Sequence, residues 1–208
     1  MDASTTDDQL MRAFAQGDAR AFETLYQRHR VALYRFVRRL LGSALAGQAD
    51  EVFQDTWERV VTARARWAPQ GASFRTWLFT LAHHRVVDCL RKSGREVNMD
   101  VGSDRSESEP WQPEGQPWAG WPEPSGHDDS AERLFWRAAG QRLLGCLDEL
   151  PLAQRTVFLL HHDDELSIDE LAAAIGLGFE TAKSRLRYAM QKLRACMGAY
   201  LPPTFEAR

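Results

Sequence analysis

The sequence lacks both long apolar runs and the motifs of familiar enzymes. No apolar segment approaches the roughly 20 residues that a membrane-spanning helix needs. The N-terminal residues Met-Asp-Ala-Ser-Thr-Thr-Asp-Asp are acidic, whereas a secretory signal begins with basic residues. There is no glycine-rich phosphate loop, no nucleophile elbow and no pair of histidines four residues apart. We therefore expect a cytoplasmic protein that is not an enzyme and needs no cofactor.

Cysteine is also scarce, and its spacing predicts no metal or redox site. Cys89, Cys146 and Cys196 lie far apart, and no two have the spacing of zinc ligands or of a redox motif. Each falls on or near an apolar helical stripe, so we expect buried free thiols. The run His161–Asp164 consists of four adjacent residues that cannot all converge from one helix. We expect a solvated helix end there and no metal site.

No segment of any length alternates apolar and polar residues as a strand does, and the whole chain follows a helical period. With 44% hydrophobic residues in a chain of 208, it can bury sizeable cores. We predict an all-α fold of two helical domains, residues 1–95 and 131–208. The helices are expected at 7–16, 19–41, 48–64, 73–92 and 131–150, with three more after Pro151.

Residues 96–130 differ in composition from the rest of the chain. They hold five of the nine prolines, are acidic, and contain Arg105 as their only Lys or Arg. This composition predicts a flexible, partly extended linker between the two domains. Trp111, Trp118 and Trp121 are unusual in a plain linker, and the sequence leaves open whether they bind a partner or pack back on a domain.

The stretch 166–197 has the pattern of a helix-turn-helix. Ser167 and Glu170 can form a capping box, and Gly176 suits the end of the first helix. In the second helix, apolar residues repeat every three or four positions, while the opposite face carries short polar and cationic side chains. A recognition helix that reads duplex DNA needs this arrangement. The alternative is a surface helical hairpin with a solvated basic face, but the cap, the turn and the one-sided charge together favour DNA binding.

Two further helices carry charge on one face. The helix at 48–64 has acidic residues near its N-terminal end, which suits either the helix dipole or docking of a basic partner. The helix at 73–92 is basic on one side and follows a loop with Arg66 and Trp67, a combination that suits single-stranded nucleic acid. Trp67 could equally belong to the core. The net charge of −3 indicates that the basic residues are concentrated locally, or that another molecule supplies part of any DNA affinity.

Taken in order, these segments resemble the extracytoplasmic-function (ECF) group of bacterial sigma factors, the promoter-reading subunits of RNA polymerase. The segments 22–26 and 49–60 are similar to the start of sigma region 2 and to its polymerase-docking helix. The segment 73–82 is similar to the promoter-melting helix. The segments 150–158 and 181–186 are similar to region 4. The family usually has asparagine where His84 stands and glycine where Glu180 stands.

The resemblance implies roles for three groups of residues. Docking on the clamp helices of core polymerase would involve Asp50, Glu51, Asp55 and Glu58. Binding of the single-stranded −10 element would involve Arg66, Trp67, Ser73, Arg75, His84 and Arg85. Binding of the duplex −35 element would involve His161, Lys183, Ser184, Arg185, Arg187 and Tyr188. No residue is implied as a catalytic group or a metal ligand.

The resemblance also implies partners: core RNA polymerase with its clamp helices and flap, promoter DNA, and an anti-sigma factor. The alternative is a helix-turn-helix regulator that binds duplex DNA by itself. Such a regulator is usually a dimer with a ligand-binding or phosphorylation domain, and the sequence shows neither. A protein-binding adaptor that uses only the acidic helix is disfavoured by the basic recognition face.

Overall fold

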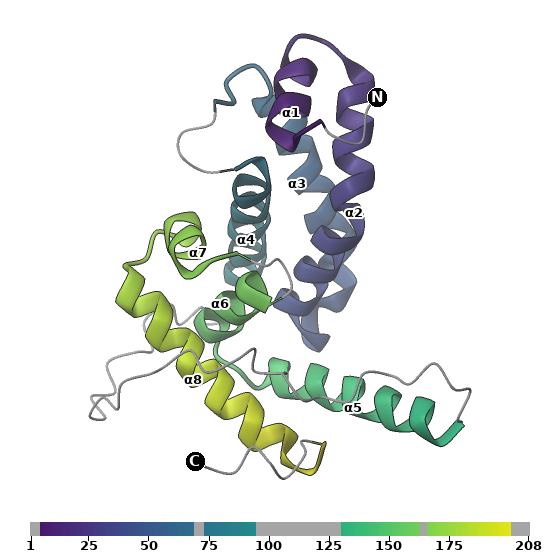
Figure 1. The fold of residues 1–208 in the computed structure, drawn as a ribbon, viewed down its shortest axis with the longest axis vertical. Coiled ribbons are helices and arrows are strands. Elements are labelled where there is room, and N and C mark those ends of the chain that lie inside the picture. Colours follow the sequence, from purple (N-terminus) through teal and green to yellow (C-terminus); the bar gives the residue numbers. More distant parts are fainter. Residues whose placement is uncertain (1–4, 69–72, 95–129, 163–165, 201–208) are drawn as a thin grey trace.

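A computed structural model describes residues 5–68, 73–94, 130–162 and 166–200, and within these ranges the fold is entirely helical (Figure 1). The α-helices are α1 (Asp7–Ala15), α2 (Ala19–Leu41), α3 (Ala49–Ala63), α4 (Phe74–Lys92), α5 (Ser130–Asp148), α6 (Leu152–His162), α7 (Ile168–Ile175) and α8 (Phe179–Met197). Two 3-10 helices, η1 (Ser43–Gln48) and η2 (Gly198–Tyr200), complete the described fold. The all-α prediction is confirmed. The predicted linker lies outside the described residues up to Ser130.

Helices α1 to α4 form an N-terminal bundle. Side chains that accept hydrogen bonds from backbone N–H groups begin three of its helices: Thr6 for α1, Asp18 for α2 and Ser73 for α4. Two acidic residues of α1 fasten it to the bundle. Asp7 pairs with His29 of α2 at 2.6 Å, and the carboxylate of Asp8 accepts a hydrogen bond from the backbone N–H at the start of α4. The caps thus set where α1, α2 and α4 begin, and the two carboxylates hold α1 against α2 and α4.

Helices α5 to α8 form a C-terminal bundle that contains the predicted helix-turn-helix, α7 and α8. Ser167 and Glu170 make the expected capping box, in which the Glu170 carboxylate accepts from the Ser167 N–H at 2.9 Å. Gly176 ends α7 with φ 68°, a left-handed conformation that favours glycine. A hydrogen bond from the Leu177 N–H to the Ala172 carbonyl, at 2.9 Å, closes the turn between α7 and α8.

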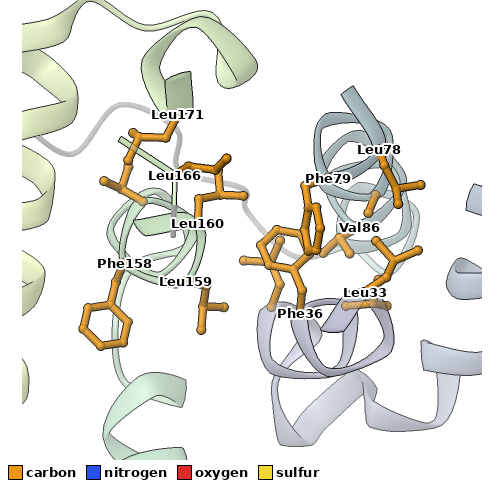
Figure 2. Close-up of a cluster of buried hydrophobic side chains, with 14 of the residues drawn as sticks. Leu33, Phe36, Leu78, Phe79, Val86, Phe158, Leu159, Leu160, Leu166 and Leu171 are labelled. Carbon is orange, nitrogen blue, oxygen red and sulfur yellow. The ribbon is translucent and has the colours of Figure 1, made fainter. Parts of the chain in front are cut away.

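The two bundles pack against each other. Helix α7 contacts α4, and both α5 and α6 contact α2 (Figure 1). The buried apolar side chains form one continuous cluster across both bundles. Figure 2 shows part of this cluster, with Leu33, Phe36, Leu78, Phe79 and Val86 of the N-terminal bundle beside Phe158, Leu159, Leu160, Leu166 and Leu171 of the C-terminal bundle. The protein therefore shares one core between bundles that the sequence predicts to be joined by a linker.

The prediction of three free thiols is wrong. Cys146 of α5 and Cys196 of α8 form a disulfide, and only Cys89 is a free cysteine. The expected position of these cysteines on apolar helical stripes does agree with the structure, because Cys146 is buried and both residues lie where α5 packs on α8. The pairing comes from that packing, which brings together residues 50 positions apart.

Candidate functional site

The acidic face of α3 is largely open to solvent. Asp50, Glu51 and Glu58 are exposed, while Asp55 is half-buried. Asp50 and Glu51 lie in the first turn, where carboxylates stabilise the helix dipole. A hydrogen bond with Asp50 raises the pKa of Tyr34 on the neighbouring helix α2. The face thus offers carboxylates on a rigid helix, which is suited to a basic partner surface.

An ion pair joins this acidic face to α4. Asp55 of α3 pairs with Arg85 of α4, and Arg85 also approaches the Asp88 carboxylate at 3.4 Å. The Arg85 side chain is only 17% exposed. Asp55, predicted to dock on a protein, and Arg85, predicted to bind DNA, are therefore held together in one ion pair.

The start of α4 and the loop before it carry the residues predicted to bind single-stranded DNA. Arg66 is exposed, and Trp67 is half-buried against the aromatic rings of Phe74 and Trp77, with centroids 6.3 and 6.5 Å away. Trp67 therefore contributes to the edge of the core and keeps part of its surface open. The Ser73 hydroxyl caps α4 by accepting from the Thr76 N–H at 3.1 Å. Residues 69–72 of the loop lie outside the described residues.

Further along α4, the two adjacent histidines have opposite environments. His84 is exposed, as its predicted contact with DNA requires, whereas His83 is buried. Burial and the neighbouring His84 lower the pKa of His83 to about 4, so that its ring is neutral at physiological pH. Arg75 is half-buried near the first turn of α7. Hydrogen bonds from Ser167 lower the pKa of Glu170 in that turn, and the charge of Arg75 adds a smaller effect in the same direction.

The recognition helix α8 carries most of the residues predicted to bind duplex DNA. Lys183, Ser184, Arg187 and Tyr188 are half-exposed on one side of the helix. The Arg187 guanidinium lies over the Tyr188 ring at 5.0 Å and its Nη2 donates to the hydroxyl at 3.3 Å, which holds both side chains in place. Arg185 does not share this face, because it is only 7% exposed.

His161 is half-exposed and makes one structural contact through its ring. Its Nδ1 is 2.8 Å from the Leu166 carbonyl oxygen, which ties the end of α6 to the entry of α7.

Within the described residues, no group of three His, Cys, Asp or Glu side chains could hold a metal ion. Asp163 and Asp164, the other members of the predicted solvated helix end, lie outside the described residues. No helix in the described part of the chain is long and apolar enough to cross a membrane.

The sequence-based selection missed Phe179, the first residue of α8. Its side chain is 41% exposed, and the Lys183 ammonium lies 6.0 Å from the ring centroid. Glu180 and Thr181 beside it are exposed too. The N-terminal residues of a recognition helix contact base edges, and an apolar ring can contact a thymine methyl group. The turn glycine in the sequence could have identified this residue, because α8 begins immediately after Gly178.

A cavity lies between α2 and α3, beside the acidic face. Its volume is about 420 Å³, and it is lined by Tyr26, Arg30, Val31, Tyr34, Arg35 and Phe53. Val31 is 54% exposed although it is apolar.

Both bundles match known sequence families. Residues 25–96 match Sigma-70 region 2, and residues 140–193 match Sigma-70 region 4. The chain is 31% identical over 191 residues to the ECF RNA polymerase sigma factor SigK of Mycolicibacterium vanbaalenii, covering 92% of this chain and 89% of that protein. It is 31% identical over 189 residues to the ECF RNA polymerase sigma factor RpoE of Cereibacter sphaeroides, covering 90% and 93%.

Solved structures of similar fold cover almost the whole chain. CnrH, solved in complex with the cytosolic domain of CnrY, has a TM-score of 0.60 at 25% identity, over 93% of this chain and 98% of CnrH. The sigma factor RpoE of Bartonella quintana, solved with the anti-sigma factor NepR, has a TM-score of 0.59 at 24% identity, over 85% and 96%.

Proposed function

The chain belongs to the ECF family of RNA polymerase sigma factors, and we propose that it binds core RNA polymerase and directs transcription initiation at specific promoters. The observation that carries this function is the presence of both sigma regions in one chain, in family order. Region 4 contains a capped helix-turn-helix with a polar and cationic recognition face. The standalone regulator is not favoured, because it does not explain a region 2 bundle with an acidic helix.

The proposed division of labour follows the two bundles. Residues 1–95 form region 2, which docks on core polymerase and binds the −10 element, and residues 131–208 form region 4, which binds the −35 element. Residues 96–130 connect them. Docking is assigned to Asp50, Glu51, Asp55 and Glu58, supported by their position on the acidic face of α3.

The DNA contacts are proposed in the same way. Single-stranded −10 DNA is assigned to Arg66, Trp67, Ser73, Arg75, His84 and Arg85, of which Arg66, Ser73 and His84 are exposed. Duplex −35 DNA is assigned to His161, Lys183, Ser184, Arg185, Arg187 and Tyr188. The paired side chains of Arg187 and Tyr188 support this surface most directly, whereas the buried Arg185 needs rearrangement to reach DNA. Phe179 joins the set because it is exposed at the start of α8.

We propose two further properties. The protein acts in the cytoplasm together with polymerase, as a non-catalytic initiation factor. An anti-sigma factor restrains it, an inference supported by the similar CnrH, which was solved in complex with the cytosolic domain of CnrY.

The assignment of the two surfaces is tested by separating core binding from initiation. Arg187→Ala should lower promoter-specific run-off transcription and leave the Kd for core polymerase unchanged, because α8 faces DNA. Glu58→Lys should weaken core binding by at least about fivefold, the effect of losing one interfacial charge pair. The matched control is Glu23→Lys, which reverses an exposed charge on α2 instead of α3. Equal loss of core binding in the Glu58 and Glu23 variants would contradict the docking face.

A further inference from the structure

Glu180 lies on the recognition face of α8, at the N-terminal end of the helix. Ser184, Arg187 and Gln191 follow it four, seven and eleven positions later, which at about 3.6 residues per turn places all four within about 60° around the helix axis. The opposite side of α8 packs on α5, α6 and α7 (Figure 1), and its buried residues include Ala182, Leu186, Ala189 and Leu193. Glu180 therefore projects from the same side of the helix as residues proposed to bind the −35 element.

The Glu180 carboxylate is open to a partner molecule. Glu180 is exposed, and within the part of the chain that the structure describes its carboxylate has no hydrogen-bond or ion-pair partner. Other carboxylates of the C-terminal bundle are engaged, since Asp148 accepts from the Ser43 N–H and Glu170 accepts from the Ser167 N–H, both at 2.9 Å. The place of Glu180 in the first turn of α8 stabilises its charge through the helix dipole and leaves both carboxylate oxygens free to accept hydrogen bonds.

A carboxylate at this place selects among bases and adds nothing to general DNA affinity. Lys183 and Arg187 carry positive charges that attract phosphates, whereas Glu180 repels them. In the major groove, cytosine presents its N4 amino group as a donor, while guanine and thymine present acceptors and no donor. Adenine presents the N7 acceptor beside its N6 donor. A carboxylate therefore favours cytosine and disfavours guanine, which has two acceptors at that edge.

The spacing along α8 indicates where this base lies. The N-terminal residues of a recognition helix are the ones that contact base edges. Glu180 precedes Arg187 by seven residues, which is about 10 Å along the helix at 1.5 Å per residue, or about three base pairs at 3.4 Å each. The base pair that faces Glu180 should therefore lie within about three base pairs of the one that faces Arg187.

We propose that Glu180 is a specificity-determining residue, which selects a cytosine in the −35 element by accepting a hydrogen bond from the N4 amino group of that base. This inference rests on the proposed function and assigns one base to the site on α8. The carboxylate acts partly by exclusion, because a guanine or thymine at the same position places its acceptors against a negative charge.

The test is a selection from promoter duplexes with a randomised −35 region, using the holoenzyme formed from the full chain and core polymerase. Wild-type holoenzyme should enrich cytosine at one position. Glu180→Ala should lower that preference by about fivefold or more, the effect of losing one base contact, and should not weaken binding to the other sequences. Glu180→Gln should shift the preference at this position to adenine, because an amide pairs with adenine N6 and N7.

Asp169→Asn is the matched control. Asp169 is an exposed carboxylate at the second residue of α7, as Glu180 is at the second residue of α8. This variant removes the same charge from the first turn of a helix and should leave the cytosine preference unchanged. Circular dichroism establishes that each variant is folded.

Three results would overturn the proposal. The first is an unchanged base preference in both Glu180 variants, which would show that the carboxylate serves only the helix dipole. The second is an equal loss of binding to all sequences in Glu180→Ala, and the third is an equal loss of cytosine preference in Asp169→Asn. If wild-type holoenzyme enriches no base anywhere in the randomised region, promoter reading by α8 is itself refuted, and with it that part of the proposed function.

Discussion

Reducing the disulfide between Cys146 and Cys196 should destabilise the C-terminal bundle substantially. The bond closes a loop with a sequence separation of 50 residues. The loop-closure relation gives an entropy change of about 14 cal/mol/K for the unfolded chain, or about 4 kcal/mol at 25 °C. For a bundle of this size, a loss of that magnitude lowers Tm by more than about 10 °C. Thiols are kept reduced in the cytosol, so the Tm measured under reducing conditions is the one that applies there.

The assay is thermal unfolding followed by circular dichroism, with and without dithiothreitol. Cys196→Ala is the preferred variant, because Cys196 is half-buried whereas Cys146 is buried and its replacement would also disturb the core. This variant should unfold at the midpoint of the reduced wild type and show no further shift with reductant. Cys89→Ser is the matched control, because replacing this free thiol should leave the reductant-dependent shift in Tm unchanged. Identical midpoints for oxidised wild type, reduced wild type and Cys196→Ala would refute the reasoning.

Three other predictions concern stability and coupling. Ser167→Ala removes the cap of α7 and should cost about 1 kcal/mol in urea unfolding, while Ser167→Thr should retain most of the stability. Burial lowers the pKa of His83 and His162 to about 4, so the unfolded chain binds more protons than the folded chain between pH 6.5 and 4. The free energy of unfolding should therefore be at its full value above pH 6.5 and fall as the pH drops through that window. An unchanged pH dependence of stability in a His83→Gln variant would contradict this assignment. Asp55→Asn and Arg85→Gln should show non-additive effects on stability in a double-mutant cycle because the two residues share an ion pair, and simple additivity would show that the pair contributes nothing.

Features set by neighbouring residues were predictable from the sequence. The capping box of Ser167 and Glu170 and the left-handed Gly176 lie as predicted, because a cap or a turn depends on residues within three or four positions. The helix bounds agree with the expected ranges to within one or two residues. The 3-10 helix η1 between α2 and α3 was not predicted from the sequence.

Features set by tertiary packing were not predictable in the same way. The disulfide depends on α5 meeting α8, and the ion pair of Asp55 with Arg85 depends on α3 meeting α4. The burial of Arg185, to which the resemblance assigned a DNA contact, likewise depends on how the helices pack. The resemblance to sigma factors predicted two regions joined by a linker, but the hydrogen bonds of Ser43 with Asp148 and of Arg155 with the Leu40 carbonyl join residues more than 100 positions apart.

The most direct test of the sigma-factor function is run-off transcription from a genomic DNA pool by purified core polymerase, with and without this protein. We predict discrete new transcript starts that depend on the protein and share aligned −10 and −35 elements. Loss of these starts in Arg187→Ala, with core binding intact, would place promoter reading on α8. Failure of the wild-type protein to bind core polymerase, with no new transcripts, would contradict the account.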